Sequence, residues 1–382
     1  MIYLDYNAST PVDERVLSTM LPYFSEVYGN PSNGYHWQGR KAARAIESAR
    51  GAVAGLIGAQ ASEIIFTSGA TESNNLAILG FARASKGRER HNRTRIVISS
   101  VEHKAVIQPA KTLSAEGFEV VFLPVDNRGI VKVEEAEKLI DDRTLMVSIQ
   151  AANNETGVIH PIPELIDIAH QHGAIFHCDA SQAVGKISVD VKAWDVDLLS
   201  LSGHKFYGPK GIGALYLKGG QFRSTFEPLC FGGNQEKGTR PGTENVPAIV
   251  GLGEASRLAQ ELLEEERQRI QQLRDMMEER LLEQLPSASV NGAGTKRLPN
   301  TINITIPKVP ADVLLLNLPE VMMGTGSACS SGTPSPSHVL LSMGLNSELA
   351  SATVRISLGR FTSEEEIERT VNLIISAVKK LS

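Results

Sequence analysis

The sequence predicts an α/β protein, with a mostly parallel seven-stranded sheet flanked by helices and a second, smaller α+β domain. Two observations predict this fold class. Between about residue 50 and residue 220, short β-branched runs alternate with longer amphipathic stretches, as in strands joined by crossover helices. After about residue 255 the pattern changes to a long charged helix followed by further strands and helices. We expect residues 14–255 to form the large domain, and residues 1–13 and 256–382 to form the small domain.

Short apolar runs bounded by turn residues predict the strands of the large domain. These runs are Glu63–Thr67, Arg95–Ser99, Glu119–Leu123, Leu145–Gln150, Ala174–Cys178, Leu198–Ser202 and Gly213–Leu217. The amphipathic stretches between them predict the helices that cover the sheet. These stretches include Thr71–Ala84, Lys104–Ala115, Ile162–His172 and the region after Val246.

The last third of the chain predicts the small domain. Its glutamates and arginines alternate around an apolar stripe from Glu261 to Gln284, which favours a helix with a solvated face. The elements predicted after it are a strand at Thr301–Ile306, a helix near Asp312–Leu318, a strand at Val354–Leu358 and a helix from Ser363 to Lys380. The segment 324–337 (GTGSACSSGTPSPS) has no apolar period, and we expect a loop with Cys329 near its middle.

Composition limits the functions open to the chain. Its 382 residues are 42% hydrophobic, and the formal net charge of −5 gives no overall positive field for direct nucleic-acid binding. Three cysteines, an odd and sparse set, favour a reducing compartment over a disulfide framework. The N-terminus does not read as a signal peptide, and no apolar stretch is long enough for a membrane span. We therefore expect a cytoplasmic protein with no membrane contact and no metal site.

A lysine follows one predicted strand directly, in SLSGHKFYGPKG. Lys205 would be costly to bury as a cation, and forming an imine with an aldehyde cofactor removes that charge. A depressed lysine pKa also makes the amine nucleophilic. A surface lysine after a strand is the commoner case, so this segment alone leaves both interpretations open.

A carboxylate stands 26 residues upstream, at the end of another apolar strand, in IFHCDASQ. Ligands of open α/β sheets gather at the carboxyl ends of the strands. There Asp179 can hold a pyridine nitrogen protonated, and Gln182 can reach a ring hydroxyl. A lone aspartate after a strand is more often a helix cap, so the interpretation depends on the pairing of Asp179 with Lys205.

Three further segments fit a site for a phosphorylated ring. The stretch 67–75 (TSGATESNN) reads as a strand, a glycine turn and a helix start, where the backbone at Ala70 and the Thr71 hydroxyl form a phosphate cradle. It contains neither a P-loop lysine nor GxGxxG, and by itself it is also an ordinary capping box. His103, just past a strand, can stack on a ring and transfer protons, and Asn154 lies in a similar turn.

Taken together, these stretches resemble the cysteine desulfurases of the fold-type I pyridoxal-phosphate enzymes, the family of NifS and IscS. The resemblance runs from YLDYNA near the N-terminus to RISLGRF at residues 355–361, which is almost the whole chain. The motifs that carry it, in order, are SGATESNN, EHKAV, NNETG, DASQAVGK, SGHKFYGPKG and GSACSS.

The resemblance implies a cofactor, pyridoxal 5'-phosphate, bound as an imine on Lys205. Asp179 would pair with its pyridine nitrogen, Gln182 with its ring oxygen, and His103 would stack on the ring and move protons. The remaining implied contacts are Ala70, Thr71, Ser202 and His204 at the phosphate, Asn154 beside the ring, and Thr243 reaching the phosphate of the partner subunit in a homodimer.

The resemblance also implies the reaction. Arg355 and Asn154 would bind the substrate L-cysteine, with the guanidinium on its carboxylate. Cys329 would accept the sulfur as a persulfide and pass it to an acceptor protein, leaving L-alanine. Cys178 and Cys230 are expected to be structural. The sequence ends at Ser382 without the extended tail by which housekeeping members dock an iron–sulfur scaffold. The acceptor therefore stays open between a scaffold, a tRNA-thiolation protein and a DNA-phosphorothioation system.

Two rival functions remain. A selenocysteine lyase or a small-amino-acid aminotransferase of the same fold would also use Lys205 and Asp179, although transamination needs no thiol such as that of Cys329. A non-catalytic scaffold for sulfur-relay proteins would be expected to lose the lysine or the cysteine, and this chain has both.

Overall fold

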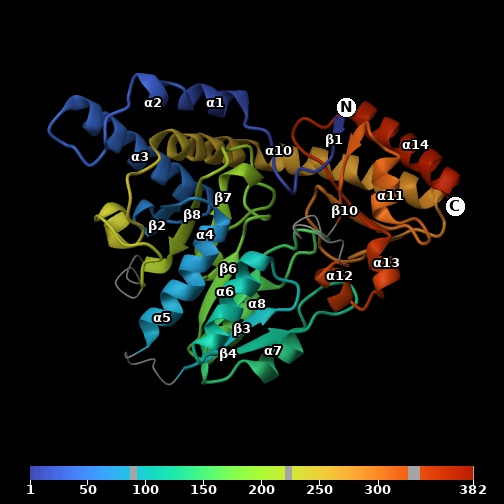
Figure 1. Ribbon diagram of the computed structural model, residues 1–382, viewed down its shortest axis with the longest axis horizontal. Coiled ribbons are helices and arrows are strands. Elements are labelled where there is room, and N and C mark those ends of the chain that lie inside the picture. Colours follow the sequence, from blue (N-terminus) through green and yellow to red (C-terminus); the bar gives the residue numbers. More distant parts are fainter. Residues whose placement is uncertain (87–92, 220–225, 326–335, 382) are drawn as a thin grey trace.

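The structure, a computed structural model, describes residues 1–86, 93–219, 226–325 and 336–381. It has two lobes (Figure 1), and the predicted α/β class is confirmed. The larger lobe contains a seven-stranded sheet, and the smaller lobe contains both chain termini.

The large sheet contains all seven predicted strands, with ends that differ by at most a few residues. From one edge to the other they are β2 (Ile64–Thr67), β8 (Gly213–Leu217), β7 (Leu198–Ser202), β6 (Ile175–Asp179), β5 (Thr144–Gln150), β3 (Arg95–Ser99) and β4 (Glu119–Leu123). Neighbours are parallel except β8, which is antiparallel to both β2 and β7. The five strands from β8 to β3 are fully buried, as expected for a sheet covered by helices on both faces.

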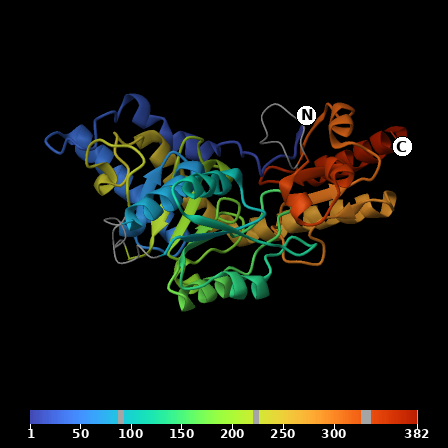
Figure 2. The ribbon, with the colours of Figure 1, turned by 60° about the horizontal axis from the view of Figure 1, so that its bottom comes forward.

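Helices cover both faces of this sheet (Figures 1 and 2). The predicted ones are α6 (Lys104–Ala115), α8 (Ile162–Gln171) and α4 (Ala70–Asn75), which continues through a π-helical turn into α5 (Phe81–Ser85). The sequence pattern did not single out the 20-residue α3 (Trp37–Leu56), whose buried stripe is mostly alanine and glycine. The remaining helices are α1 (Glu14–Met20), α2 (Pro22–Ser25), α7 (Val133–Leu139) and α9 (Val191–Trp194).

The small lobe contains a four-stranded antiparallel sheet in the order β12 (Gly324–Thr325), β13 (Thr353–Ser357), β10 (Thr301–Thr305) and β9 (Ser289–Val290). The N-terminal β1 (Ile2–Tyr3) pairs in parallel with β11 (Val321–Met322). The loop predicted for 324–337 is wrong at its start, because residues 324–325 form β12 beside β13. The helices here are α11 (Ala311–Leu316), α12 (His338–Ser342), α13 (Ser347–Ser351) and α14 (Glu364–Leu381).

One long helix, α10 (Val246–Gln284), runs through both lobes. Its first part packs on α1 and α3, and Leu252 belongs to the core of the large lobe. Its last part places Ile270 and Met277 in a separate core, which also contains Leu4 from the N-terminal segment. The domain boundary at residue 255 stays a prediction, since the helix crosses it without a break.

The parallel strands bring the chemistry to one edge of the sheet. The carboxyl ends of β3, β5, β6 and β7 lead directly into the segments that contain His103, Asn154, Asp179 and Lys205. At the same edge β8 starts with Gly213, where a Cβ atom would lie 2.7 Å from the Cα atom of Gly69 and 2.5 Å from the Leu201 carbonyl oxygen. Only a residue without a side chain allows the turn before α4 to lie this close to the sheet.

Replacing Gly213 with alanine should lower the free energy of unfolding by about 1–3 kcal/mol, because rigid backbone surrounds the new methyl group. It should also weaken ligand binding at the start of α4. Urea unfolding measures the first effect. Gly51→Ala is the matched control: a Cβ atom at this position would have no neighbour within 4 Å, and alanine in the middle of α3 should raise stability by about 0.5–1 kcal/mol. Equal stability of the two variants would contradict the packing argument.

Candidate active site

A cavity of about 710 Å³ opens at the carboxyl edge of the large sheet. Lys205 and Asp179 both line it, so the structure confirms the sequence-based expectation that an amine and a carboxylate face one space. The other predicted site residues on its wall are Ala70, Thr71, His103, Asn154, Gln182, Ser202, His204 and Arg355. Residues from β6, from the turn after β7 and from β13 of the small lobe thus meet at one site.

Asp179 ends β6 and is buried, 7% exposed. Its Oδ2 accepts a hydrogen bond from Asn74 Nδ2 at 2.7 Å, and its Oδ1 accepts from the Ser181 amide at 3.0 Å. The Ser181 hydroxyl donates to the same Oδ1. These donors fix the orientation of the carboxylate. Sequence reasoning missed Asn74 as its partner, although Asn74 lies in the motif chosen as the phosphate cradle.

Lys205 ends a short 3₁₀ turn, Gly203–Lys205, directly after β7. Its amine donates to the backbone carbonyl oxygens of Asn7 at 2.7 Å and Ala8 at 2.9 Å. Carbonyl oxygens carry no full negative charge, so they orient the amine without forming a salt bridge. The N-terminal segment therefore lies against the lysine that the sequence indicated.

The start of α4 lies on the cavity wall, where the sequence predicts a phosphate cradle. Gly69 adopts φ +149° and caps the helix, and the first-turn N–H groups at Ala70 and Thr71 have no acceptor inside the helix. Ser202 and His204 line the same end of the sheet. Burial, followed by the charge of Lys205, lowers the pKa of His204 to about 4, so it is neutral at neutral pH. Its Nδ1 lies 3.2 Å from the Ser9 hydroxyl.

His103 is the N-cap of α6. Its Nδ1 accepts a hydrogen bond from the Ala105 amide at 3.1 Å. Burial lowers its pKa below the ordinary value of 6.5, which favours the neutral imidazole. A neutral ring whose Nδ1 accepts a hydrogen bond must carry its proton on Nε2. His103 can thus donate a proton or a hydrogen bond from Nε2.

Arg355 reaches the cavity from β13. Its Nη2 donates to Asp5 Oδ1 at 2.7 Å and its Nη1 to the Asn154 carbonyl oxygen at 3.0 Å. Its buried Nε has no hydrogen-bond partner among the described residues. An unpaired buried N–H of a guanidinium is costly, and a ligand carboxylate would satisfy it. Such a carboxylate would share the guanidinium with Asp5.

The remaining sequence-predicted residues lie elsewhere. Thr243 is exposed and lines a separate cavity with Tyr28 and Asn30, so the chain does not bring it to its own Lys205. Cys329 lies outside the described residues. Cys178 is fully buried and Cys230 is exposed, and the structural roles expected for both stay predictions.

Two buried carboxyl groups near the site were not predicted. Burial raises the pKa of Glu102 to about 8, although Ser99 and the Gln150 amide donate to its Oε1. Burial likewise raises the pKa of Glu155 to about 7, and the Ser337 hydroxyl donates to its Oε2 at 2.5 Å. Glu102 precedes His103 and Glu155 follows Asn154, each a few residues after a sheet strand. This proximity to predicted site residues was the only sequence signal for the two carboxyl groups.

The donor set fits one kind of ligand. Helix N–H groups and hydroxyls suit a phosphate, the Asp179 carboxylate suits a protonated ring nitrogen, and the Lys205 amine suits an aldehyde. The unpaired Arg355 Nε suits the carboxylate of an amino acid. No group of three His, Cys, Asp or Glu side chains that could hold a metal occurs in residues 1–86, 93–219, 226–325 and 336–381. No helix in those ranges is long and apolar enough to cross a membrane. Fold and cavity together are those of an α/β enzyme in which a lysine and an aspartate face one cavity.

Comparison with known proteins gives the family. Residues 2–370 match the model of aminotransferase class-V, and the chain belongs to this family. It is 45% identical over 380 residues to cysteine desulfurase IscS of Ehrlichia chaffeensis. The aligned residues cover all of this chain and 92% of that protein. A NifS-like protein superposes with a TM-score of 0.91 at 38% identity, covering 99% of each chain. SspA in complex with cysteine superposes with a TM-score of 0.83 at 38% identity, covering 95% of this chain and 100% of that one.

Glu102 should give the protein a measurable pH dependence of stability. Its pKa is raised from 4.5 to about 8 on folding, so between these values the folded state holds a proton that the unfolded state has released. Stability from this group is therefore present below pH 4.5 and is lost as pH rises toward 8. The variant Glu102→Gln should lose this component, and the pH slope of the unfolding free energy should change by up to about 1.4 kcal/mol per pH unit.

Urea unfolding at several pH values between 5 and 8 measures this slope. The exposed Glu283 provides the matched control, since Glu283→Gln should leave the slope of the wild type unchanged. If the unfolding free energies of the wild type and Glu102→Gln changed with pH in parallel, the Glu102 carboxyl group would be ionised in the folded protein throughout this range.

Proposed function

We propose that the protein is a pyridoxal-phosphate-dependent cysteine desulfurase. The observation that carries the proposal is the single cavity that Lys205, Asp179 and Arg355 line together. Membership of aminotransferase class-V and the similarity to IscS support it. The cysteine in the similar SspA complex supports cysteine as substrate. We also propose the cytoplasm as its location, because its cysteine usage suits a reducing compartment.

The residues of the cavity have distinct roles toward the cofactor. Lys205 would bind its aldehyde, Asp179 its ring nitrogen and Gln182 its ring oxygen, while His103 would stack on the ring beside Asn154. The start of α4, with Ala70 and Thr71, would hold the phosphate together with Ser202 and His204. When bound, pyridoxal 5'-phosphate supplies an electron sink for negative charge at Cα of an amino acid.

The chain itself would supply orientation and proton transfer. Arg355, which lines the cavity, would bind the carboxylate of L-cysteine and so set the direction of the substrate. The Lys205 amine would take up the Cα proton once the substrate occupies the aldehyde. His103 would deliver a proton from Nε2, because its Nδ1 is already occupied by the Ala105 amide.

Cys329 would accept the sulfur. Its thiolate would attack the sulfur of the bound cysteine, so that an S–S bond forms while the Cβ–S bond breaks. The electron pair of the broken bond would stay on the carbon fragment, which after protonation leaves as L-alanine. The persulfide on Cys329 would then pass to an acceptor protein, whose identity is open between iron–sulfur assembly, tRNA thiolation and DNA phosphorothioation.

Replacing Cys329 with serine should leave the visible colour of the bound cofactor intact and abolish transfer of cysteine sulfur to an acceptor thiol. Replacing Lys205 with alanine should remove the visible band itself. Absorption spectra and a persulfide-transfer assay measure the two effects. Cys230→Ser is the matched control and should retain both. Unimpaired transfer by Cys329→Ser would overturn the role given to Cys329.

We also propose that the protein is a homodimer in which Thr243 binds the phosphate in the partner subunit. Thr243 is exposed on this chain, apart from the cavity that contains Lys205. Analytical ultracentrifugation should find a dimer. Thr243→Ala should weaken binding of pyridoxal 5'-phosphate about tenfold, which corresponds to one lost hydrogen bond to a charged group. Thr112→Ala, on the exposed face of α6, should not weaken it. A monomer with full cofactor affinity would contradict the proposal.

A further inference from the structure

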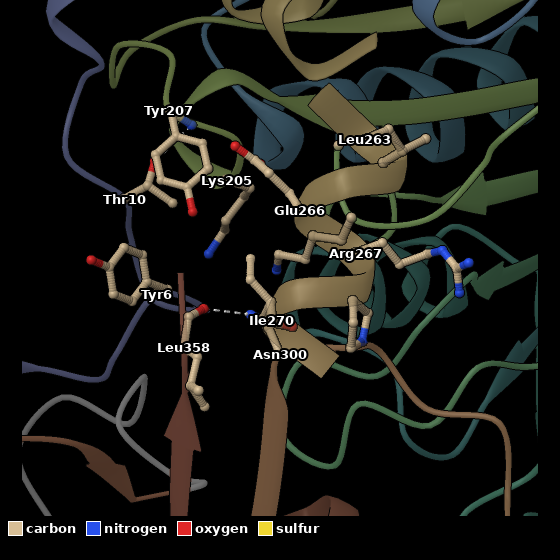
Figure 3. A pocket seen from close by; sticks show the side chains of 13 residues that line it. Tyr6, Thr10, Lys205, Tyr207, Leu263, Glu266, Arg267, Ile270, Asn300 and Leu358 are labelled. Atoms are coloured by element: carbon tan, nitrogen blue, oxygen red, sulfur yellow. Dashed lines mark hydrogen bonds between the residues drawn. The ribbon is translucent and has the colours of Figure 1, made fainter. Parts of the chain in front are cut away.

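A second lysine lies beside the proposed catalytic lysine. Lys186 and Lys205 both line a small cavity between the two lobes, with a volume of about 20 Å³. Figure 3 shows this cavity, with Lys205 extending among Tyr6, Tyr207 and Glu266. Lys205 also lines the large cavity, so it forms part of the wall between the two spaces.

The Lys186 amine contacts two side-chain amides. It donates to Gln182 Oε1 at 2.6 Å and to Asn7 Oδ1 at 3.0 Å. An ammonium group has only donors, so both amides must turn their oxygen atoms toward it. The Gln182 NH₂ group consequently points the other way, and one of its hydrogens is donated to the Asn7 carbonyl oxygen at 2.9 Å. The second hydrogen is left for the large cavity, which Gln182 lines.

Without this lysine, the orientation of the Gln182 amide would be less determined. The oxygen and nitrogen ends of an amide have nearly the same shape, so packing distinguishes them poorly and hydrogen bonds decide. The same argument holds for Asn7, whose Oδ1 also accepts from Asn300 Nδ2 at 3.0 Å. Lys186 and the Asn7 carbonyl oxygen, which can only accept, therefore together fix which atom of Gln182 a ligand meets.

The charge state of Lys186 depends on its neighbours. Burial, followed by the charges of Lys205 and Arg355, lowers the pKa of Lys186 well below its usual value. Burial thus disfavours the ammonium form, whereas a negatively charged oxygen bound nearby would favour it, and the ammonium would in turn favour the deprotonated form of that oxygen. The titratable groups that face this position from the surrounding elements are Lys205, Arg355, His204, Tyr6, Tyr207, Glu266 and Arg267.

We propose that Lys186 is a positioning residue that turns the Gln182 N–H toward an anionic oxygen of the bound heterocycle and keeps that oxygen deprotonated. This inference rests on the proposed function, since the heterocycle is pyridoxal 5'-phosphate. Lys186 acts through Gln182, and it need not contact the substrate.

The test uses the full-length protein loaded with pyridoxal 5'-phosphate. Lys186→Met removes the donor and keeps the aliphatic stem. It should weaken cofactor binding about tenfold, the effect of one lost hydrogen bond to a charged group. It should also shift the pH midpoint of the cofactor's visible band upward, because the ring oxygen loses both a donor and a nearby positive charge. Lys111→Met, on the exposed face of α6, is the matched control and should change neither value.

A double-mutant cycle separates positioning from general destabilisation. In a Gln182→Ala background, Lys186→Met should lower cofactor affinity by less than about a further threefold, because the amide through which Lys186 acts is already absent. Lys186→Gln retains an N–H donor without a charge. It should recover part of the affinity, and it replaces Lys186→Met if that variant does not fold. The proposal would be overturned if Lys186→Met had the same band midpoint and cofactor affinity as the wild type. It would also be overturned if the affinity losses of Lys186→Met and Gln182→Ala were fully additive. A wild-type protein without any visible band would instead overturn the proposed function.

Discussion

The hydrogen bonds of Asn7 join the two lobes at the active site. Its carbonyl oxygen accepts from Lys205 at 2.7 Å and Gln182 at 2.9 Å, both in the large lobe. Its side chain donates to Thr301 Oγ1 at 2.9 Å, and its amide donates to Ser357 Oγ at 2.9 Å, both in the small lobe. Asn7 is 1% exposed, so removing one partner would leave the others unsatisfied away from water. The position of β13, and with it Arg355, relative to Lys205 depends on this residue.

The cavity gathers cationic side chains although the chain as a whole is negatively charged. The protein carries a formal net charge of −5, yet Lys205, Lys210 and Arg355 line the cavity, with Lys186 just behind it. The carboxylates on the wall are held by donors, Asp179 by Asn74 and Ser181, Asp5 by Arg355, and Glu72 by Arg240. The cationic groups can therefore bind anions such as a phosphate and a carboxylate, even though the overall charge repels polyanions.

The fold could be predicted because the strands are short apolar runs separated by turn residues. A parallel sheet buried on both faces requires that pattern, and the seven predicted strands are all present. The expected loop at 324–337 was wrong at Gly324–Thr325, because pairing with β13 outweighed a composition typical of turns. Helix α3 lacks large apolar residues along much of its buried face and packs instead by close approach of alanine and glycine to α10. Such a face has little hydrophobic contrast, so the sequence signal for α3 was weak.

By itself, the sequence determined the seven strands of the large sheet and the positions of Asp179 and Lys205 after two of them, because local periodicity and the edge rule for parallel sheets need no knowledge of distant contacts. Only the tertiary structure decided how these groups are held. The partners of Asp179, the two amides that meet Lys186, the burial of Glu102 and the pairing of Asp5 with Arg355 all join residues from separate parts of the fold. Hydrogen bonds and burial depend on distances between segments that approach only after folding, and no local pattern in the chain encodes those distances.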